Sequence, residues 1–286
     1  MTMRVLRLVF FSLCFSFFGI GAHAADCASP ITNTSTGAKS ECTLNNDAIG
    51  VDLYGLWLCQ QTPTYSTYQN VCEEVVYNIS APQEVRVTIG GETNITANGN
   101  LSLPLGTYTH AVLLVRNMLY SKGSVQFDSG RKGKTGSGVY CWTIDGSTFA
   151  ETAINSLAVE CGSSAGTAGF MKSEKQCWTG SCVFEKLSND KTSSVNDAYA
   201  LSAPTVQSTL ASDTAYLLGI AAFKDGYKPT ITNTTKRVVM GFELTGNGKV
   251  RLRSSFDGAN CHDGSSVFGC VTGIMQQGFE FIVEVE

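Results

Sequence analysis

The residues best suited by type and spacing to do chemistry form the run Gly-Ser-Ser-Ala-Gly at positions 162–166. The run fits the pattern G-x-S-x-G, in which a serine, here Ser164, becomes an exposed nucleophile on a sharp turn between a strand and a helix. That turn needs a helix directly after the serine and a parallel sheet around it. Thr-Ala-Gly-Phe-Met follows instead, and strands and helices do not alternate anywhere in the sequence. We therefore interpret the run as a loop of small residues and keep a secreted serine hydrolase only as a remote alternative.

Two of the three histidines, His110 and His262, lie outside the N-terminal segment that we expect to be removed. His262 stands between Cys261 and Asp263, and His110 lies in a predicted strand two residues after Tyr108. General acid–base catalysis requires a side chain within hydrogen-bond reach of its partner and with a tuned pKa. The sequence places no such partner beside either histidine. We predict that the protein is not an enzyme and has no catalytic residues.

A second group of polar residues, Asp257, Asn260 and Asp263, could bind calcium. Calcium takes carboxylate and carbonyl oxygens from glycine-containing loops of this kind. The spacing matches no EF-hand, because a bidentate glutamate is missing at the required offset. A simple cluster of turns is the competing interpretation. We therefore predict no obligatory cofactor, with calcium as the candidate metal.

Aromatic residues form the third candidate site. Tyr65 and Tyr68 follow Tyr54 and Trp57 closely in the sequence. Aromatic rings suit recognition surfaces, because they are large and lose little side-chain entropy when they are fixed. If Tyr65 and Tyr68 are exposed, they form a platform for glycans, and a carbohydrate-binding or attachment module is our alternative function. Aromatic residues near disulfides also pack in cores, and for these two tyrosines the sequence leaves both interpretations open.

The first 24 residues have the features of a secretory signal peptide. Arg4 and Arg7 form a positive N-terminal region, residues 8–20 are mostly apolar, and residues 22–24 read Ala-His-Ala, a small-x-small cleavage site. The apolar stretch is shorter than the roughly 20 residues that a membrane-spanning helix needs. We expect a mature chain without an integral membrane segment that is secreted, extracellular or at the cell surface, with the periplasm as an alternative.

Cysteine usage supports the same compartment. Cys14 leaves with the signal, and the ten cysteines that remain of the eleven suit a disulfide framework in an oxidising compartment. Many connectivities are open, and we favour pairs of sequence neighbours because each pair brackets a loop-like segment. Zinc is the competing interpretation, but the sequence has no C-x-x-C motif. The favoured pairs are Cys27 with Cys42, Cys59 with Cys72, Cys141 with Cys161, Cys177 with Cys182, and Cys261 with Cys270.

The charge of the chain argues against two classes of partner. The signal contains two of the 20 basic residues and none of the 24 acidic ones, so the mature chain has a net charge of −6. A mildly acidic chain without a basic block is a poor match for nucleic acid or for an anionic membrane surface. Charged residues make up only 15% of the chain. Serine, threonine, asparagine and glycine supply most of the polarity, which suits β-rich extracellular proteins.

The elements that would position these residues are predicted to be strands. Residues 107–119 read as one long strand whose middle is apolar on both faces, so it has to be covered on both sides, and we place it at the centre of a sandwich. We find no convincing amphipathic helix. The predicted fold is all-β: an antiparallel sandwich stapled by disulfides, of the jelly-roll or immunoglobulin-like class. Further strands are predicted at residues 50–58, 74–80, 84–89, 138–144 and 214–223.

A basic, glycine-rich stretch at residues 128–137 gives the best domain boundary in the chain. We interpret it as a solvated linker. Residues 25–128 would then form the N-terminal part of the sandwich, and residues 214–286 the C-terminal part that completes it. Residues 129–213 contain short segments and two predicted disulfides, and we interpret them as a loop-rich insertion or a second small β subdomain.

The end of the chain suggests how such a scaffold would work. Residues 236–244 and 249–256 are predicted to pair as a hairpin, and residues 278–286 form a last, alternating strand. Such a strand either completes its own sheet or adds to the edge of a neighbouring molecule and builds filaments. We predict a non-enzymatic cell-surface or matrix subunit that acts by assembly or adhesion. Its expected partners are further copies of itself or other surface components, with glycans as the alternative ligand.

Overall fold

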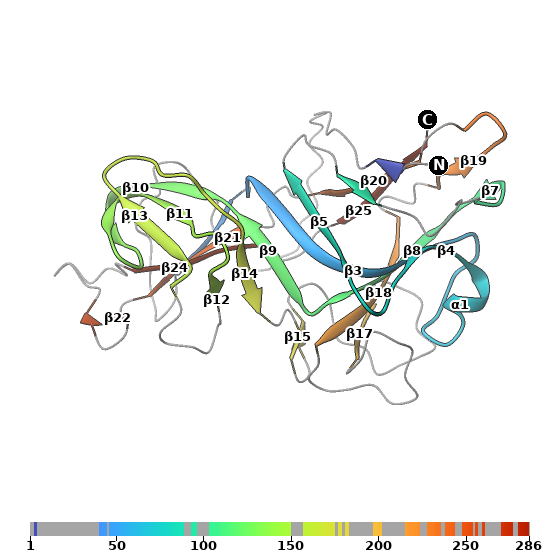
Figure 1. Ribbon diagram of the computed structural model, residues 1–286, viewed down its shortest axis with the longest axis horizontal. Helices are drawn as coiled ribbons and strands as arrows, with labels where there is room; N and C mark the ends of the chain where they lie inside the picture. Colours follow the sequence, from blue (N-terminus) through green and yellow to red (C-terminus); the bar gives the residue numbers. More distant parts are fainter. Residues whose placement is uncertain are drawn as a thin grey trace, which may run out of the picture.

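The computed structural model describes residues 3–4, 40–44, 46–88, 93–95, 103–149, 157–174, 177–178, 181–182, 197–201, 215–223, 228–235, 238–243, 248–253, 255–256, 259–260, 270–276 and 280–285. Within these residues the chain is all-β, as predicted. The helix α1 (Tyr68–Val71) has four residues, and the other regular elements are strands. Two large sheets and five two-stranded ladders spread along the long axis of the molecule (Figure 1).

The nine-stranded sheet is built on β3 (Ala48–Cys59), whose twelve residues are all buried. β8 (His110–Arg116) and β9 (Met118–Lys122) pair with one edge of β3. β4 (Cys72–Tyr77) and β5 (Gln83–Thr88) pair with its other edge, and all four are antiparallel to it. A strand that is buried along its whole length and paired on both edges is the most enclosed element of a sheet. The centre is therefore β3.

The predicted long strand is instead two strands. Asn117 interrupts the ladder between β8 and β9. The register along β3 changes between Leu53, which faces Val115 on β8, and Gly50, which faces Tyr120 on β9. The additional residues on the β8–β9 side form a bulge, which bends a strand locally and re-aims its side chains. Apolar residues continue on both sides of the bulge, so their pattern does not reveal it.

The sheet divides at this bulge into two branches. β18 (Tyr216–Ala222) pairs with β8, and β17 (Asp197–Leu201) pairs with β18, both antiparallel. On the other branch β14 (Met171–Glu174) pairs antiparallel with β9, and β12 (Thr148–Phe149) pairs parallel with β14. The part of β3 next to the bulge therefore connects two groups of strands that diverge from each other.

The second large sheet has six strands, and its neighbours are antiparallel except for one parallel bridge between Lys132 and Cys270. The predicted linker lies partly within this sheet, so the boundary predicted after residue 128 falls inside a strand. The strands in spatial order are β13 (Val159–Gly162), β11 (Ser137–Thr143), β10 (Ser124–Lys132), β24 (Cys270–Gln276), β21 (Gly248–Arg253) and β2 (Ser40–Leu44).

The predicted C-terminal hairpin is wrong. The two strands concerned lie in different sheets, since β21 pairs with β2 and β24, whereas β20 pairs with the terminal strand β25. A glycine-rich turn favours a hairpin locally, but packing against cross-strand neighbours decides which strands pair. The two-stranded ladders are β1 (Met3–Arg4) with β6 (Asn94–Ile95), β7 (Gly106–Thr107) with β19 (Thr230–Ile231), β15 (Cys177–Trp178) with β16 (Ser181–Cys182), β20 (Val238–Glu243) with β25 (Glu280–Val285), and β22 (Ser255–Phe256) with β23 (Ala259–Asn260).

Among the described residues, buried apolar side chains form one core cluster on each face of β3, a third on the six-stranded sheet and a small fourth that contains Phe149 and Met171. Ile49, Val51 and Leu56 belong to the largest cluster, which is mainly aliphatic. Tyr54 and Trp57 belong to the cluster on the opposite face, which is rich in aromatic residues. β3 therefore packs on both faces, as the sequence had suggested for the neighbouring strand.

Candidate functional site

The buried carboxylate of Asp52 is the centre of a polar network in the middle of β3. Asp52 is 3% exposed and lies where the pairing partner of β3 changes from β8 to β9. A carboxylate that is removed from water destabilises the fold unless charged or hydrogen-bonding groups surround it. Strands β5, β8 and β9 supply those groups, so the network forms where the sheet divides.

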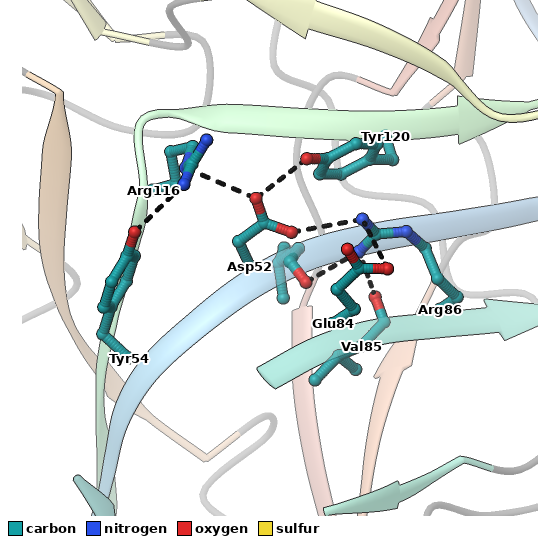
Figure 2. A network of polar contacts seen from close by, with 8 residues as sticks. Asp52, Tyr54, Glu84, Val85, Arg86, Arg116 and Tyr120 are labelled. Carbon is teal, nitrogen blue, oxygen red and sulfur yellow. Dashed lines mark hydrogen bonds and ion pairs between the residues drawn. The ribbon is translucent and has the colours of Figure 1, made fainter. Parts of the chain in front are cut away.

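Three side chains contact the carboxylate directly (Figure 2). The hydroxyl of Tyr120 donates to Oδ2 of Asp52 at 2.8 Å, and Nη2 of Arg86 lies 3.1 Å from Oδ1. Nε of Arg116 lies 3.4 Å from Oδ2. Arg116 extends the network by donating from Nη2 to the hydroxyl of Tyr54 at 3.1 Å. We call these five residues the Asp52 network.

Arg86 is held by more than its ion pair. Its Nη1 donates to the carbonyl oxygens of Val51 at 2.9 Å and Val85 at 3.0 Å. Its guanidinium carbon lies 3.5 Å from the centroid of the Tyr120 ring, a cation–π contact. Gly50 makes room for this side chain, because a Cβ there would lie 2.3 Å from Cδ of Arg86. The glycine in β3 thus allows Arg86 to lie across the strand.

The electrostatics of the network favour a fixed arrangement. Burial raises the pKa of Tyr120 to about 12, and its hydrogen bond to Asp52 acts in the same direction. The hydroxyl therefore stays protonated at neutral pH and remains a donor. The pKa of Arg116 is raised above its usual value, and the largest cause is its hydrogen bond with Tyr54. Both carboxylate oxygens of Asp52 have protein partners. Ion pairs and a hydrogen bond therefore connect β3 with β5, β8 and β9.

The structure places Tyr65 and Tyr68 in the interior. They are 2% and 1% exposed. The ring of Tyr68 packs edge-on against Trp57 with the centroids 5.0 Å apart, and the ring of Tyr65 lies 4.8 Å from that of Tyr199 on β17. Burial raises the pKa of Tyr68 above its usual value. The expectation that these two rings form an exposed glycan platform is therefore corrected.

Ser164 is exposed in the segment between β13 and β14. β13 is antiparallel to β11, and the residues after Ser164 lead into β14 without a helix, so the strand-to-helix turn of a catalytic serine is not formed there. Gly166 lies against Trp142, since a Cβ at this glycine would be 2.2 Å from the indole ring. The small residues of the run allow the chain to lie on that ring.

His110 lies at the start of β8, opposite Cys59 on β3. It is buried, and its Nδ1 is 2.8 Å from the hydroxyl of Thr109. Burial lowers the pKa of His110, which favours the neutral imidazole at neutral pH.

The residues of the calcium hypothesis are placed only in part. Asn260 lies in β23, opposite Ser255 on β22. Asp257 and Asp263 lie outside the described residues, as does His262. Within the described part of the chain, no group of three or more His, Cys, Asp or Glu residues could hold a metal ion.

Two of the five predicted disulfides are present in the described structure, Cys59 with Cys72 and Cys141 with Cys161. Each joins residues that face one another on adjacent antiparallel strands, β3 with β4 in the larger sheet and β11 with β13 in the smaller. Each large sheet therefore carries a covalent cross-link between neighbouring strands.

The other cysteines are placed incompletely. Cys270 is disulfide-bonded, and its predicted partner Cys261 lies outside the described residues, as does Cys27, the predicted partner of Cys42. Cys177 and Cys182 face one another in the ladder of β15 and β16.

Glu160 on β13 organises the turn between β10 and β11, a role that the sequence did not suggest. Its carboxylate accepts the hydroxyl of Thr135 at 2.8 Å and the backbone N–H groups of Thr135, Gly136 and Cys161. A Cβ at Gly133 would lie 2.4 Å from the backbone nitrogen of Cys161. The glycines of this stretch therefore allow the turn to lie against β13, which corrects its interpretation as a solvated linker.

Arg131 also contradicts that interpretation. It is 1% exposed, with its guanidinium carbon 5.1 Å from the centroid of the Phe127 ring and Nη2 3.7 Å from the carboxylate of Asp128. Lys132 and Lys134, in contrast, are exposed. Only part of the basic stretch is therefore in water.

Replacing Glu160 by glutamine is expected to destabilise the protein at neutral pH by about 1–2 kcal/mol, since hydrogen bonds to a partly exposed carboxylate are lost. Partial burial acts to raise the pKa of Glu160, but the hydrogen bonds from Thr135, Gly136 and Cys161 outweigh it and lower the pKa. Because the folded-state pKa is depressed, this stability is present above the unfolded-state pKa and is lost as the pH falls through the folded-state value.

Urea unfolding of both proteins at pH 7 and pH 3 measures the effect. The gap between wild type and Glu160→Gln should narrow at pH 3. The control is Glu73→Gln, which removes an exposed carboxylate on β4 and should change stability little at either pH. A gap of the same size at both pH values would contradict the assigned role.

Comparisons with protein-family models, with curated proteins and with solved structures found no match to this chain. Among the described residues, no helix is both long and apolar enough to cross a membrane.

Proposed function

We propose that this chain is an exported, non-enzymatic structural protein of the cell surface or matrix, which works by assembly or adhesion through its sheet surfaces. The observation that carries the proposal is that each large sheet contains a disulfide between facing residues of neighbouring strands, Cys59 with Cys72 and Cys141 with Cys161. Disulfides form and persist in oxidising compartments, and the N-terminal segment has the features of an export signal. We further propose that the two sheets form a scaffold of the sandwich class.

The use of charge in the interior supports a mechanical role. Arg86 pairs with the carboxylate of Asp52 and donates to backbone carbonyl oxygens of β3 and β5. Glu160 fastens a turn to the strand on which it lies. These contacts fix neighbouring strands and a turn relative to one another, which suits a rigid structural protein.

The last strand bears on how assembly would occur. β25 is paired along its length with β20 of the same chain. A free terminal strand that adds to a neighbour is therefore not what the structure contains, and donation of β25 would first require its exchange. We propose that assembly uses exposed faces rather than that strand.

The test is the size of the purified mature protein, produced from residue 25 onward through an oxidising export route. Sedimentation velocity and negative-stain electron microscopy should show species larger than the monomer, growing with concentration. A protein that stays monomeric at every concentration, and does not bind a surface component from the same source, would exclude assembly and adhesion.

A further inference from the structure

Arg116 is the most exposed member of the Asp52 network. Its side chain is 41% exposed, whereas the side chains of Arg86 and Asp52 are 21% and 5% exposed. Tyr54 and Tyr120 are buried. Arg116 is the last residue of β8, directly before the bulge at Asn117. The network therefore extends from the interior of the sheet to water at this one guanidinium.

Two contacts hold the guanidinium of Arg116 along one of its edges. Nε lies 3.4 Å from Oδ2 of Asp52, and Nη2 donates to the hydroxyl of Tyr54 at 3.1 Å. A guanidinium is planar and has five N–H donors. Its second edge, Nη1 with the other N–H of Nη2, makes no hydrogen bond or ion pair among the residues that the structure describes. In Figure 2 one nitrogen of Arg116 points away from both partners.

The charges of the network leave Arg116 only partly compensated. The single carboxylate of Asp52 lies between two guanidinium groups, those of Arg86 and Arg116. Glu84 lies 3.8 Å from Arg86, and Figure 2 shows it beside Arg86 and away from Arg116. An anion placed against the second edge of Arg116 would balance the remaining positive charge.

Tyr216 adds an aromatic ring beside this guanidinium. It faces Arg116 across the ladder of β18 and β8, and facing residues lie on the same side of a sheet. The ring of Tyr216 packs edge-on against that of Tyr54, with the centroids 5.2 Å apart. Tyr216 is half-buried, and Ala215 directly before it is exposed. A guanidinium and an aromatic ring, both in contact with Tyr54, therefore lie next to each other at the edge of the aromatic cluster.

These two groups suit a sugar that carries a carboxylate. Two parallel N–H groups of an arginine match the two oxygens of a carboxylate. A tyrosine ring offers a large, rigid surface to the apolar face of a sugar. Because Asp52 and Tyr54 already hold Arg116, binding costs little of its side-chain entropy. The chain is acidic overall, so an anion would be attracted by such a local site rather than by the net charge.

We propose that Arg116 and Tyr216 form a binding site for an acidic sugar, a uronic acid unit of a surface polysaccharide. The inference rests on the proposed adhesion function and names the class of ligand for it. The second edge of the guanidinium would bind the carboxylate, and the ring of Tyr216 would contact the sugar. An acidic peptide offers the same carboxylate without the sugar ring, and we choose the probes to separate the two.

Isothermal titration calorimetry of the purified mature protein with three polymers tests the site. The wild type should bind polygalacturonate, and should bind its methyl-esterified form and poly-aspartate at least about tenfold more weakly, as expected when a charge-assisted hydrogen bond or a ring contact is lost. Arg116→Lys keeps the charge but has no planar fork, so binding to polygalacturonate should weaken by about tenfold or more. Tyr216→Leu, which removes the ring, should weaken the same binding.

The control variant Lys134→Gln removes an exposed positive charge from the turn between β10 and β11 and should bind like the wild type. Circular dichroism checks that each variant is folded. Undiminished binding by Arg116→Lys and Tyr216→Leu, or an equal loss in Lys134→Gln, would overturn the site. Equally tight binding of poly-aspartate would overturn the assignment to a sugar.

The failure of this site differs from the failure of the proposed function. A wild type that binds none of the three polymers, yet forms larger species or binds a surface component from its source, would overturn the acidic-sugar site alone. A wild type that binds no polymer, stays monomeric and binds no surface component would overturn both.

Discussion

Replacing Asp52 by asparagine is expected to lower the free energy of unfolding by about 3 kcal/mol. The substitution keeps the shape of the side chain and removes the charge that balances Arg86 and Arg116. Arg86 would remain partly buried over the Tyr120 ring without its ion-pair partner, which is the costly outcome when one member of a buried pair is removed. The Arg116 side chain is 41% exposed, so water screens its ion pair with Asp52. The expected loss of stability is therefore at the lower end of the range for breaking a buried ion pair.

Urea unfolding followed by tryptophan fluorescence measures this loss. Glu84→Gln is the matched control, because Glu84 also contacts Arg86, at 3.8 Å, but its side chain is 76% exposed. That substitution should change stability by less than about 0.5 kcal/mol. If Asp52→Asn cost no more than Glu84→Gln, the branch of the sheet would be held by apolar packing alone, and the Asp52 network would have no stabilising role.

The sequence contains a signal for this network. Asp52 is the single charged residue in the apolar stretch of residues 50–58, which was predicted to be a strand. A charge is rarely buried unless it is paired, so a buried strand with one carboxylate predicts basic partners on its neighbours. The sequence could not say which arginines, since Arg86 and Arg116 reach Asp52 through strand pairing and a bulge.

Local patterns predicted strands well and their neighbours poorly. The alternation of apolar and polar residues predicted the strand β5, in which Val85 and Val87 are buried as expected. The pairing of β20 with β25 joins segments about forty residues apart, and no local pattern encodes such a contact. Glycine is ambiguous for a related reason: Gly133 allows close approach to β13, whereas its residue type alone indicates a turn or a linker.

Residue type also failed to separate a recognition surface from a core. Tyr65 and Tyr68 would serve either. Tyr65 packs against Tyr199, which lies more than a hundred residues further along the chain, and Tyr68 packs against Trp57 on β3. Cysteine spacing was more informative. Two pairs of sequence neighbours are bonded because each lies on adjacent antiparallel strands, where facing residues come close enough for a disulfide.

Removing the disulfide between Cys59 and Cys72 is expected to destabilise the protein by about 3 kcal/mol, the loop-closure value for residues 13 positions apart. For a chain of this size the melting temperature should fall by roughly 6–12 °C. The double variant Cys59→Ala/Cys72→Ala leaves the other cysteines in place. Thermal unfolding by circular dichroism, under non-reducing conditions, gives the shift.

The location of this cross-link predicts a second effect that the disulfide between Cys141 and Cys161 lacks. Cys59 and Cys72 belong to the aromatic cluster with Trp57, whereas Cys141 and Cys161 lie in the core of the six-stranded sheet. Cys59→Ala/Cys72→Ala should therefore disturb the near-ultraviolet circular dichroism of the Trp57 and Tyr68 pair. Cys141→Ala/Cys161→Ala, which opens a loop of 20 positions, should lower stability by a similar amount and leave the contribution of Trp57 to that signal in place, measured as the difference from the same variant carrying Trp57→Phe. If both variants changed the aromatic signal equally, the two sheets would share one tightly coupled core, and the separation of the clusters on which the proposed scaffold depends would be wrong.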